Sequence, residues 1–207
     1  MNLNEHWDNI FENTNDEKLG WYEDDVKQTL KFFDFIDDFK DLTIFITGAG
    51  TSLLVDNFVG KTKELILNDI SKKALEKLEL KHQKFKNNIR FFHHDLSKEF
   101  PENLTKSDIW IDRAVLHFLV EEKDILKYFE NLKNSLKANA YILFAEFSLE
   151  GASSCASLPI KKYNLQKLSK YLGKEFVLIK EENYTFINPF GGERPYIYAL
   201  FRRVDNQ

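Results

Sequence analysis

The sequence predicts an α/β fold: a mostly parallel seven-stranded sheet with an antiparallel terminal strand and helices on both faces. Five short apolar runs, rich in β-branched and aromatic residues, alternate with segments whose apolar residues recur at helical spacing. That alternation is typical of parallel strands joined by crossover helices. Two further runs near the C-terminus have no helical pattern between them, so they predict a hairpin with antiparallel pairing.

The first 40 residues predict helices that precede the sheet. Trp7, Ile10 and Phe11 stand at near-helical spacing in a polar segment, which predicts a short docking helix followed by a loop through Gly20. Residues 24–39 begin with two acids and repeat apolar residues on one face, which predicts a longer amphipathic helix.

The remaining elements follow in order. The alternating strands are predicted at residues 42–47, 65–67, 89–92, 108–111 and 141–147, and the terminal hairpin at 176–179 and 196–201. Helices are predicted over residues 53–59, from an N-cap at Ser71 through Leu78, over 125–136, and from an N-cap at Asn164 to Gly173. No linker or repeat interrupts the pattern, so we expect one domain over residues 1–207.

Composition excludes several classes of protein. Acids outnumber bases by 33 to 29, giving a net charge of -4, which argues against a nucleic-acid binder. The single cysteine, Cys155, excludes an internal disulfide and a multi-cysteine zinc site. No run reaches the roughly 18 apolar residues of a membrane span, and no signal-peptide pattern is present. We therefore expect a cytoplasmic protein.

Four predicted strands end in glycine or an acid: Gly48-Ala49-Gly50, Asp69, Asp95 and Asp112. The carboxyl ends of parallel strands share one edge of the sheet, where ligands of such folds bind. Glycine lets the backbone approach a ligand closely, and the two oxygens of a carboxylate can accept both hydroxyls of a ribose. Each feature also has a plainer explanation, a tight turn for the glycines and a helix N-terminal charge for Asp69.

Other cofactor patterns fit less well. A nicotinamide-binding loop needs a third glycine where the chain has Leu53. Gly60-Lys61-Thr62 lacks the upstream glycine of a phosphate loop and predicts a turn. His93 and His94 are adjacent in a strand and point to opposite faces, so we expect no metal site there.

Four segments, in order and spacing, carry a family resemblance: IFITGAGTS, LILNDIS, FFHHDLS and DIWIDRAVLHFL. They resemble the motifs of class I S-adenosylmethionine-dependent methyltransferases, and HWDNIF, GWYEDD and SCASLPIKKYN resemble a bacterial subgroup of small single-domain members. The resemblance spans nearly the whole chain. It implies a Rossmann-like fold, S-adenosylmethionine as cofactor with S-adenosylhomocysteine as product, and residues 1–40 as a helical lid. The family usually has an acid at the position of Ile46 and often a glycine at Ser52.

The resemblance also implies the site residues. It places the glycine loop beside the methionine and ribose, Asp69 on the ribose hydroxyls, and Asp95 beside the adenine amino group. Aromatic rings of the lid attract sulfonium-like cations. The residues implied in cofactor binding are Trp21, Tyr22, Gly48, Ala49, Gly50, Asp69, Ile70, Asp95, Leu96 and Asp112.

Asp112, Arg113 and His117 are the candidate catalytic residues. His117 can act as a general base or a substrate hydrogen-bond partner, and a partly buried helix histidine fits its position equally well. Cys155 lies in a loop of small residues expected to border the substrate pocket as an apolar filler. Arg113 can hold an anionic substrate, whereas Arg194 is more simply a solvated residue.

We expect methyl transfer to a sulfur, nitrogen or oxygen nucleophile of a small molecule, by a monomer or homodimer that binds neither nucleic acid nor membrane. Three alternatives stay open. They are a protein lysine methyltransferase, a catalytically degenerate module that binds an adenosyl ligand, which Ile46 permits, and a nicotinamide oxidoreductase, which Leu53 disfavours.

Overall fold

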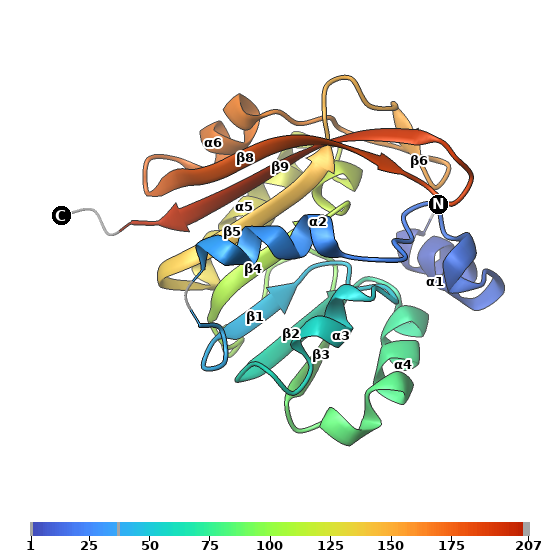
Figure 1. Cartoon of the computed structure of the whole chain (residues 1–207), viewed down its shortest axis with the longest axis horizontal. Coiled ribbons are helices and arrows are strands. Elements are labelled where there is room, and N and C mark those ends of the chain that lie inside the picture. Colours follow the sequence, from blue (N-terminus) through green and yellow to red (C-terminus); the bar gives the residue numbers. More distant parts are fainter. Residues whose placement is uncertain (1, 37, 205–207) are drawn as a thin grey trace.

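The computed structural model describes residues 2–36 and 38–204 and contains one seven-stranded sheet with the order β3-β2-β1-β4-β5-β9-β8 (Figure 1). The strands are β1 (Thr43–Ile46), β2 (Glu64–Asp69), β3 (Ile89–His93), β4 (Ser107–Arg113), β5 (Leu136–Phe147), β8 (Phe176–Ile187) and β9 (Glu193–Arg203). β1 to β5 pair in parallel. β9 pairs antiparallel with both β5 and β8. The predicted fold class is therefore confirmed.

The C-terminal hairpin differs from the prediction in one respect. β9 lies inside the sheet between β5 and β8, so the antiparallel strand is second from the edge. The edge strand β8 runs in the same direction as β1 to β5, because two antiparallel pairings restore the direction.

Helices cover both faces. On one face lie α2 (Lys27–Leu30), the 3₁₀ turn η2 (Lys31–Phe35), α3 (Leu54–Phe58) and α4 (Lys72–Lys81); on the other lie α5 (Glu122–Asn134) and α6 (Leu165–Leu172). α1 (Leu3–Asn13) stands beside α4 (Figure 1). The other 3₁₀ turns are η1 (Asp16–Lys18), η3 (Gln83–Phe85) and η4 (Leu116–Phe118). None of the helices in the described residues is both long and apolar enough to span a membrane.

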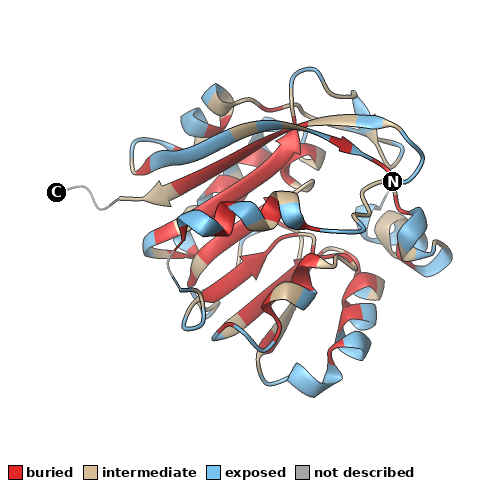
Figure 2. Cartoon of the chain, viewed as in Figure 1, coloured by how far each residue is buried: buried red, intermediate tan, exposed pale blue. Residues whose placement is uncertain are grey.

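The buried core divides into two layers, one on each side of the sheet. Ile44 and Ile46 of β1 face the layer under α2, α3 and α4, and Phe45 faces the layer under α5. Phe45 stacks on Trp110 of β4 with ring centroids 4.2 Å apart. The central strands are mostly red in Figure 2, whereas the outer faces of the helices are exposed. Burial on both faces explains the unbroken apolar runs of these strands.

Two local predictions are confirmed by side-chain caps. Ser71 Oγ accepts a hydrogen bond from Ala74 N at the start of α4, and Asn164 caps α6 in the same way. The helix predicted over residues 24–39 instead breaks after Leu30 into η2. Because a 3₁₀ helix has three residues per turn, Phe33 and Ile36 lie on the same side of η2 and both pack against the sheet.

A two-stranded hairpin follows β5 and was not predicted. Its strands are β6 (Ser154–Cys155) and β7 (Leu158–Pro159), joined by Ala156 and Ser157 with φ of 50° and 63°. Two successive positive φ values form the type of hairpin turn that normally uses Asn-Gly. The sequence therefore carried no turn signal at this position.

Candidate active site

The loop after β1 lies at the point where the strand order reverses. Gly48 and Gly50 have φ of +44° and +52°, which L side chains rarely adopt. A Cβ on Gly48 would meet Val115 Cγ2 at 2.4 Å, so the loop after β4 packs directly on this backbone. Ala49 N donates to Asn68 O at 2.8 Å, which ties the loop to β2. The result is a backbone turn held between β2 and the loop after β4.

Asp69 organises this turn. Its Oδ2 accepts a hydrogen bond from Gly50 N and its Oδ1 accepts one from Ser71 N, both at 2.8 Å. The side chain is almost fully buried. Burial raises the pKa of Asp69 to about 6, although the backbone hydrogen bonds act in the opposite direction.

The end of β3 is held beside it. The Asn68 side chain donates to Phe92 O at 3.0 Å and to His94 O at 2.9 Å, and Asp95 Oδ1 accepts from Ser97 N. The rings of His93 and His94 diverge, because His93 Nε2 contacts Ile70 O whereas His94 Nε2 contacts Glu99 O. Within the described residues, no three His, Cys, Asp or Glu side chains are grouped to hold a metal ion.

Two adjoining cavities open at this edge, with empty volumes of about 880 and 580 Å³ that include some open solvent. Trp21, Gly48 and Arg113 line both. The first cavity is also lined by Leu3, Trp7, Phe11, Asn68, Asp69, Ile70, His94, Asp95, Leu96, Ala114, Val115, Phe118, Leu119 and Cys155. The second is also lined by Leu19, Tyr22, Glu23, Ile46, Thr47, Ala49, Gly50, Thr51, Ser52, Leu53, Leu54 and Ile111. Such volumes suit a cofactor and a small substrate.

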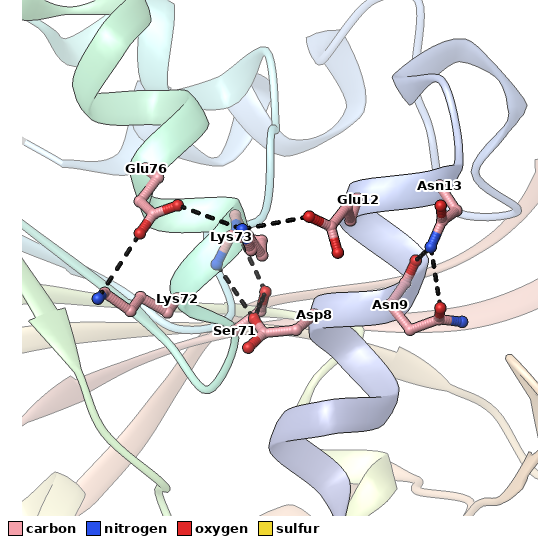
Figure 3. A network of polar contacts seen from close by, with 9 residues as sticks. Asp8, Asn9, Glu12, Asn13, Ser71, Lys72, Lys73 and Glu76 are labelled. Atoms are coloured by element: carbon pink, nitrogen blue, oxygen red, sulfur yellow. Dashed lines mark hydrogen bonds and ion pairs between the residues drawn. The ribbon is translucent and has the colours of Figure 1, made fainter.

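Helix α1 covers the first cavity and is held at both sides. Asp8 Oδ1 accepts hydrogen bonds from Ser71 Oγ at 2.7 Å and Lys73 N at 3.1 Å, at the first turn of α4 (Figure 3). His6 Nε2 lies 3.0 Å from Ala156 O in the turn of the β6–β7 hairpin. Burial raises the pKa of Asp8, but these hydrogen bonds outweigh burial and the net shift is downward, which favours the ionised carboxylate.

Aromatic side chains form the underside of this cover. The Trp7 ring packs edge-on against Trp21 at 5.4 Å and against Phe118 at 5.0 Å between centroids. Phe11 lies over the glycine loop, and a Cβ on Gly50 would meet its ring at 3.2 Å. The wall opposite the acids is therefore apolar and aromatic.

Arg113 lies at the boundary of the two cavities. Its Nε is 3.0 Å from Glu23 Oε2, with side-chain exposures of only 11% and 8%. Its Nη1 donates to Trp21 O, and the guanidinium lies over the ring of Phe186, 5.1 Å from the centroid. Its buried Nη2 has no hydrogen-bond partner among the described residues. Burial raises the pKa of Glu23, and Arg113 opposes that rise.

The structure does not bring Asp112 or His117 to the wall of either cavity, because both are fully buried behind the loop after β4. Asp112 Oδ1 accepts from the backbone N–H groups of Val115 and Leu116, and Oδ2 accepts from Tyr128 Oη at 2.5 Å. Burial, and then the neighbouring Glu146, raise the pKa of Asp112 well above its usual range.

Glu146 completes this buried cluster. Its Oε2 accepts from His117 N at 3.1 Å and contacts His117 Nδ1 at 2.7 Å, and its Oε1 accepts from Val115 N. The carboxyl groups of Asp112 and Glu146 together hold residues 114–118, whose Val115 and Phe118 line the first cavity. The catalytic roles of Asp112 and His117 stay predictions.

Ten of the residues assigned from the sequence come together around the cavities: Trp21, Tyr22, Gly48, Ala49, Gly50, Asp69, Ile70, Asp95, Leu96 and Arg113. Sequence reasoning missed Glu23, Glu146 and the residues of α1 that face the cavity. A lone acid within the apolar strand Tyr141–Phe147 was the available signal for Glu146.

The fold is Rossmann-like, and the glycine loop, Asp69 and Asp95 meet at the switch point of its sheet. Residues 45–142 match the family model described as a methyltransferase domain. The match identifies a methyltransferase domain over these residues, and the solved structures that share the fold of the chain include S-adenosylmethionine-dependent methyltransferases. Among curated proteins, none matches this sequence.

Solved structures share the fold at low sequence identity. An S-adenosylmethionine-dependent methyltransferase from Anabaena variabilis superposes with a TM-score of 0.79 at 14% identity, over 97% of this chain and 93% of that one. The N-methyltransferase NodS from Bradyrhizobium japonicum, in complex with S-adenosylhomocysteine, gives 0.71 at 12%, over 99% and 100%. The 1,6-didemethyltoxoflavin N1-methyltransferase of Burkholderia thailandensis gives 0.62 at 16%, over 80% and 72%.

Proposed function

We propose that this enzyme transfers the methyl group of S-adenosylmethionine to a sulfur, nitrogen or oxygen atom of a small molecule. The observation that carries the proposal is the apolar cavity under α1, which is continuous with the glycine loop. A covered cavity suits a small acceptor better than a side chain on a folded protein surface. NodS and the toxoflavin enzyme, which share the fold, are both described as N-methyltransferases.

The cofactor assignment is supported by the chemistry of the glycine loop and its surroundings. Each Asp69 oxygen accepts one backbone N–H and keeps a further lone pair for a ribose hydroxyl. Ile70 and Leu96 supply apolar contacts for the adenine, and Asp95 lies beside them for its amino group. Gly48 lines both cavities, so the backbone of the glycine loop borders the space proposed for the chain between ribose and methionine.

The acceptor is proposed to bind against apolar and aromatic residues of the first cavity. These include Leu3, Trp7, Phe118, Leu119 and Cys155. We therefore expect an acceptor with an apolar or aromatic body, bound close to Arg113.

When bound, the cofactor supplies a methyl group on a positively charged sulfur. The chain then needs mainly to align the acceptor and exclude water; alignment alone can contribute roughly 7 to 11 kcal/mol. The rings of Trp7 and Trp21 lie where they shield the site, and Asp112 and His117 act through the loop they hold. A strong base at the cavity wall is unnecessary for a neutral amine or thiol acceptor.

Thermal unfolding with S-adenosylmethionine, S-adenosylhomocysteine and NAD in parallel tests cofactor choice. Ligand at 100 times its Kd adds about 2.7 kcal/mol, which corresponds to a rise in Tm of roughly 5 to 10 °C. We expect this rise with the two adenosyl sulfur ligands and not with NAD. A rise with NAD alone contradicts the proposal.

Transfer of a labelled methyl group then identifies the acceptor class. Small thiols, amines and phenols are incubated with the enzyme, and a protein extract is incubated separately. Label in a small molecule supports the proposal. Label confined to a protein band identifies a protein methyltransferase, and binding without transfer to either identifies a degenerate binding module.

A further inference from the structure

The second cavity has an unusual distribution of charge. Glu23 and Arg113 are the only charged side chains among the described residues that line it. The wall around them is apolar or small, with Ile46, Thr47 and Gly48 at the end of β1. A negative and a positive group therefore stand side by side in surroundings that otherwise offer a ligand no charge.

The pair is nearly removed from water and incompletely paired. Glu23 and Arg113 contact each other at 3.0 Å, and both side chains are about nine-tenths buried. Buried ions are costly unless their remaining hydrogen-bonding groups are also satisfied. Arg113 Nη2 is a buried donor without a partner in the described part of the chain. Glu23 therefore does not satisfy every donor of Arg113, a residue that lines both cavities.

The other carboxylates of the site are already engaged elsewhere. Asp69 and Asp95 line the first cavity and not the second. Both oxygens of Asp69 accept backbone N–H groups, and Asp95 accepts Ser97 N. Strand β1 contributes no charge, since Ile46 stands at its last position. Glu23 is thus the carboxylate that a cation in the second cavity would meet.

We propose that Glu23 and Arg113 form the clamp for the amino-acid portion of the cofactor. The Arg113 guanidinium receives the α-carboxylate, and the Glu23 carboxylate receives the α-ammonium group. The opposite charges of the pair match the opposite charges of the ligand, and Gly48 lines both the cavity that holds Asp69 and the cavity that holds Glu23. This inference rests on the proposed placement of the adenosine at Asp69 and Asp95.

The clamp also connects the cofactor to the cover of the site. Glu23 directly follows Trp21 and Tyr22, and Arg113 Nη1 donates to Trp21 O at 3.2 Å. An amino-acid group held by the pair would therefore fix the segment that leads from α1 to the sheet. Ligands without that group would add nothing to the hydrogen bond and the ion pair that join this segment to Arg113.

Binding calorimetry with two ligands tests the clamp. S-adenosylhomocysteine carries the amino-acid portion, whereas 5′-methylthioadenosine keeps the adenosine and sulfur but ends in a methyl group. We expect the wild-type protein to bind S-adenosylhomocysteine at least about 30-fold more tightly, the ratio typical of a lost buried charge contact. Equal affinities would overturn the proposal without any variant.

The variant Glu23→Gln separates the clamp from the rest of the site. We expect it to weaken S-adenosylhomocysteine binding by at least about 30-fold and to leave methylthioadenosine within about twofold. The matched control is Asp24→Asn, which removes an exposed charge one residue away and should change neither affinity. Equal losses for both ligands, or no loss for either, would overturn the clamp.

Failure of the cofactor assignment gives a different result. If neither ligand binds the wild-type protein, the adenosyl site itself is wrong and the clamp falls with it. If both bind and only the Glu23→Gln result is negative, the cofactor assignment stands.

Discussion

His117 Nδ1 lies 2.7 Å from Glu146 Oε2, and neither side chain is exposed to solvent. Burial lowers the pKa of His117 to about 3, so the imidazole is neutral at physiological pH. Burial also raises the pKa of Glu146 to about 7. The histidine therefore donates a hydrogen bond from Nδ1 to an acid that also accepts the His117 backbone N–H. This contact fixes the loop that forms one wall of the first cavity.

The role of His117 can be tested by matched variants. His117→Asn retains a donor for Glu146, whereas His117→Leu fills the space without one. We expect the Leu variant to lower the free energy of unfolding in urea by about 1 to 3 kcal/mol and the Asn variant to lose less. With an identified acceptor, the Asn variant should keep most of the turnover. Loss of turnover in the Asn variant, at unchanged stability and cofactor affinity, would instead show that His117 is a base.

The Asp69 carboxyl should make cofactor affinity depend on pH. Its pKa of about 6 means that it becomes protonated as the pH falls below 6, and a protonated carboxyl accepts fewer hydrogen bonds. We expect affinity for S-adenosylhomocysteine to be constant above about pH 7 and to fall toward tenfold per unit well below pH 6. Asp69→Asn should bind weakly with no such dependence. A wild-type affinity that is flat between pH 5 and 7 would contradict this.

The same group has the opposite effect on the stability of the ligand-free protein. Its pKa is higher in the fold than the ordinary 3.8, so the folded state binds the proton more tightly than the unfolded chain. The Asp69 contribution to stability is therefore most favourable below about pH 4 and declines as the pH rises through 6. Subtracting the stability of Asp69→Asn at each pH isolates this slope.

Gly48 should not tolerate a side chain. Gly48→Ala places a Cβ at a φ of +44° and 2.4 Å from Val115 Cγ2, so the loop after β4 must move. We expect a loss of about 1 to 3 kcal/mol in unfolding free energy, with weakened cofactor binding. Gly20→Ala is the control, because its Cβ meets nothing within 4 Å; it should change stability by less than about 0.5 kcal/mol. Similar losses for both variants would show that Gly48 has no special conformation.

The contact of Asp8 with α4 should control the release of the product. Asp8→Ala removes two hydrogen bonds to a carboxylate, and we expect S-adenosylhomocysteine to dissociate about tenfold faster. Amide hydrogen exchange in residues 3–13 should accelerate by a similar factor. Glu12→Ala, which breaks only the exposed ion pair with Lys73, should change neither rate by more than about twofold (Figure 3). Equal effects of the two variants would argue against a lid held by Asp8.

Much of the site could be predicted because parallel strands end at a common edge. The strand ends at Gly48, Asp69 and Asp95 line the cavities as expected. Asp112 shows where this reasoning stops. Neighbouring residues of a strand face opposite sides, so Arg113 reaches the cavity whereas Asp112 points into the layer under α5. Which of the two residues reaches the cavity depends on the alternation of the strand at its last residue. The hydrophobic pattern of the sequence does not fix that position to within one residue.

The parts that were missed depend on contacts between distant segments. Glu23 could not be assigned to the site from the sequence, because its partner in the ion pair, Arg113, lies ninety residues further along the chain. The β6–β7 turn uses Ala156 and Ser157 in a conformation their residue types do not favour, and His6 of α1 contacts it. The secondary-structure propensities of single residues do not depend on such distant contacts, so these elements could be identified only from the structure.

The position of β9 inside the sheet bears on how this chain folds as it is synthesised. β8 leaves the ribosome before β9 and finds no partner on the sheet, because the strand that joins it to β5 does not yet exist. Until β9 is made, the edge of β5 that β9 will pair with stays open. Every residue that lines the two cavities precedes β8 in the chain and is therefore synthesised earlier. The binding site is thus translated first and its supporting sheet is closed last, which makes the β5 flank the surface that the nascent chain must protect from mispairing.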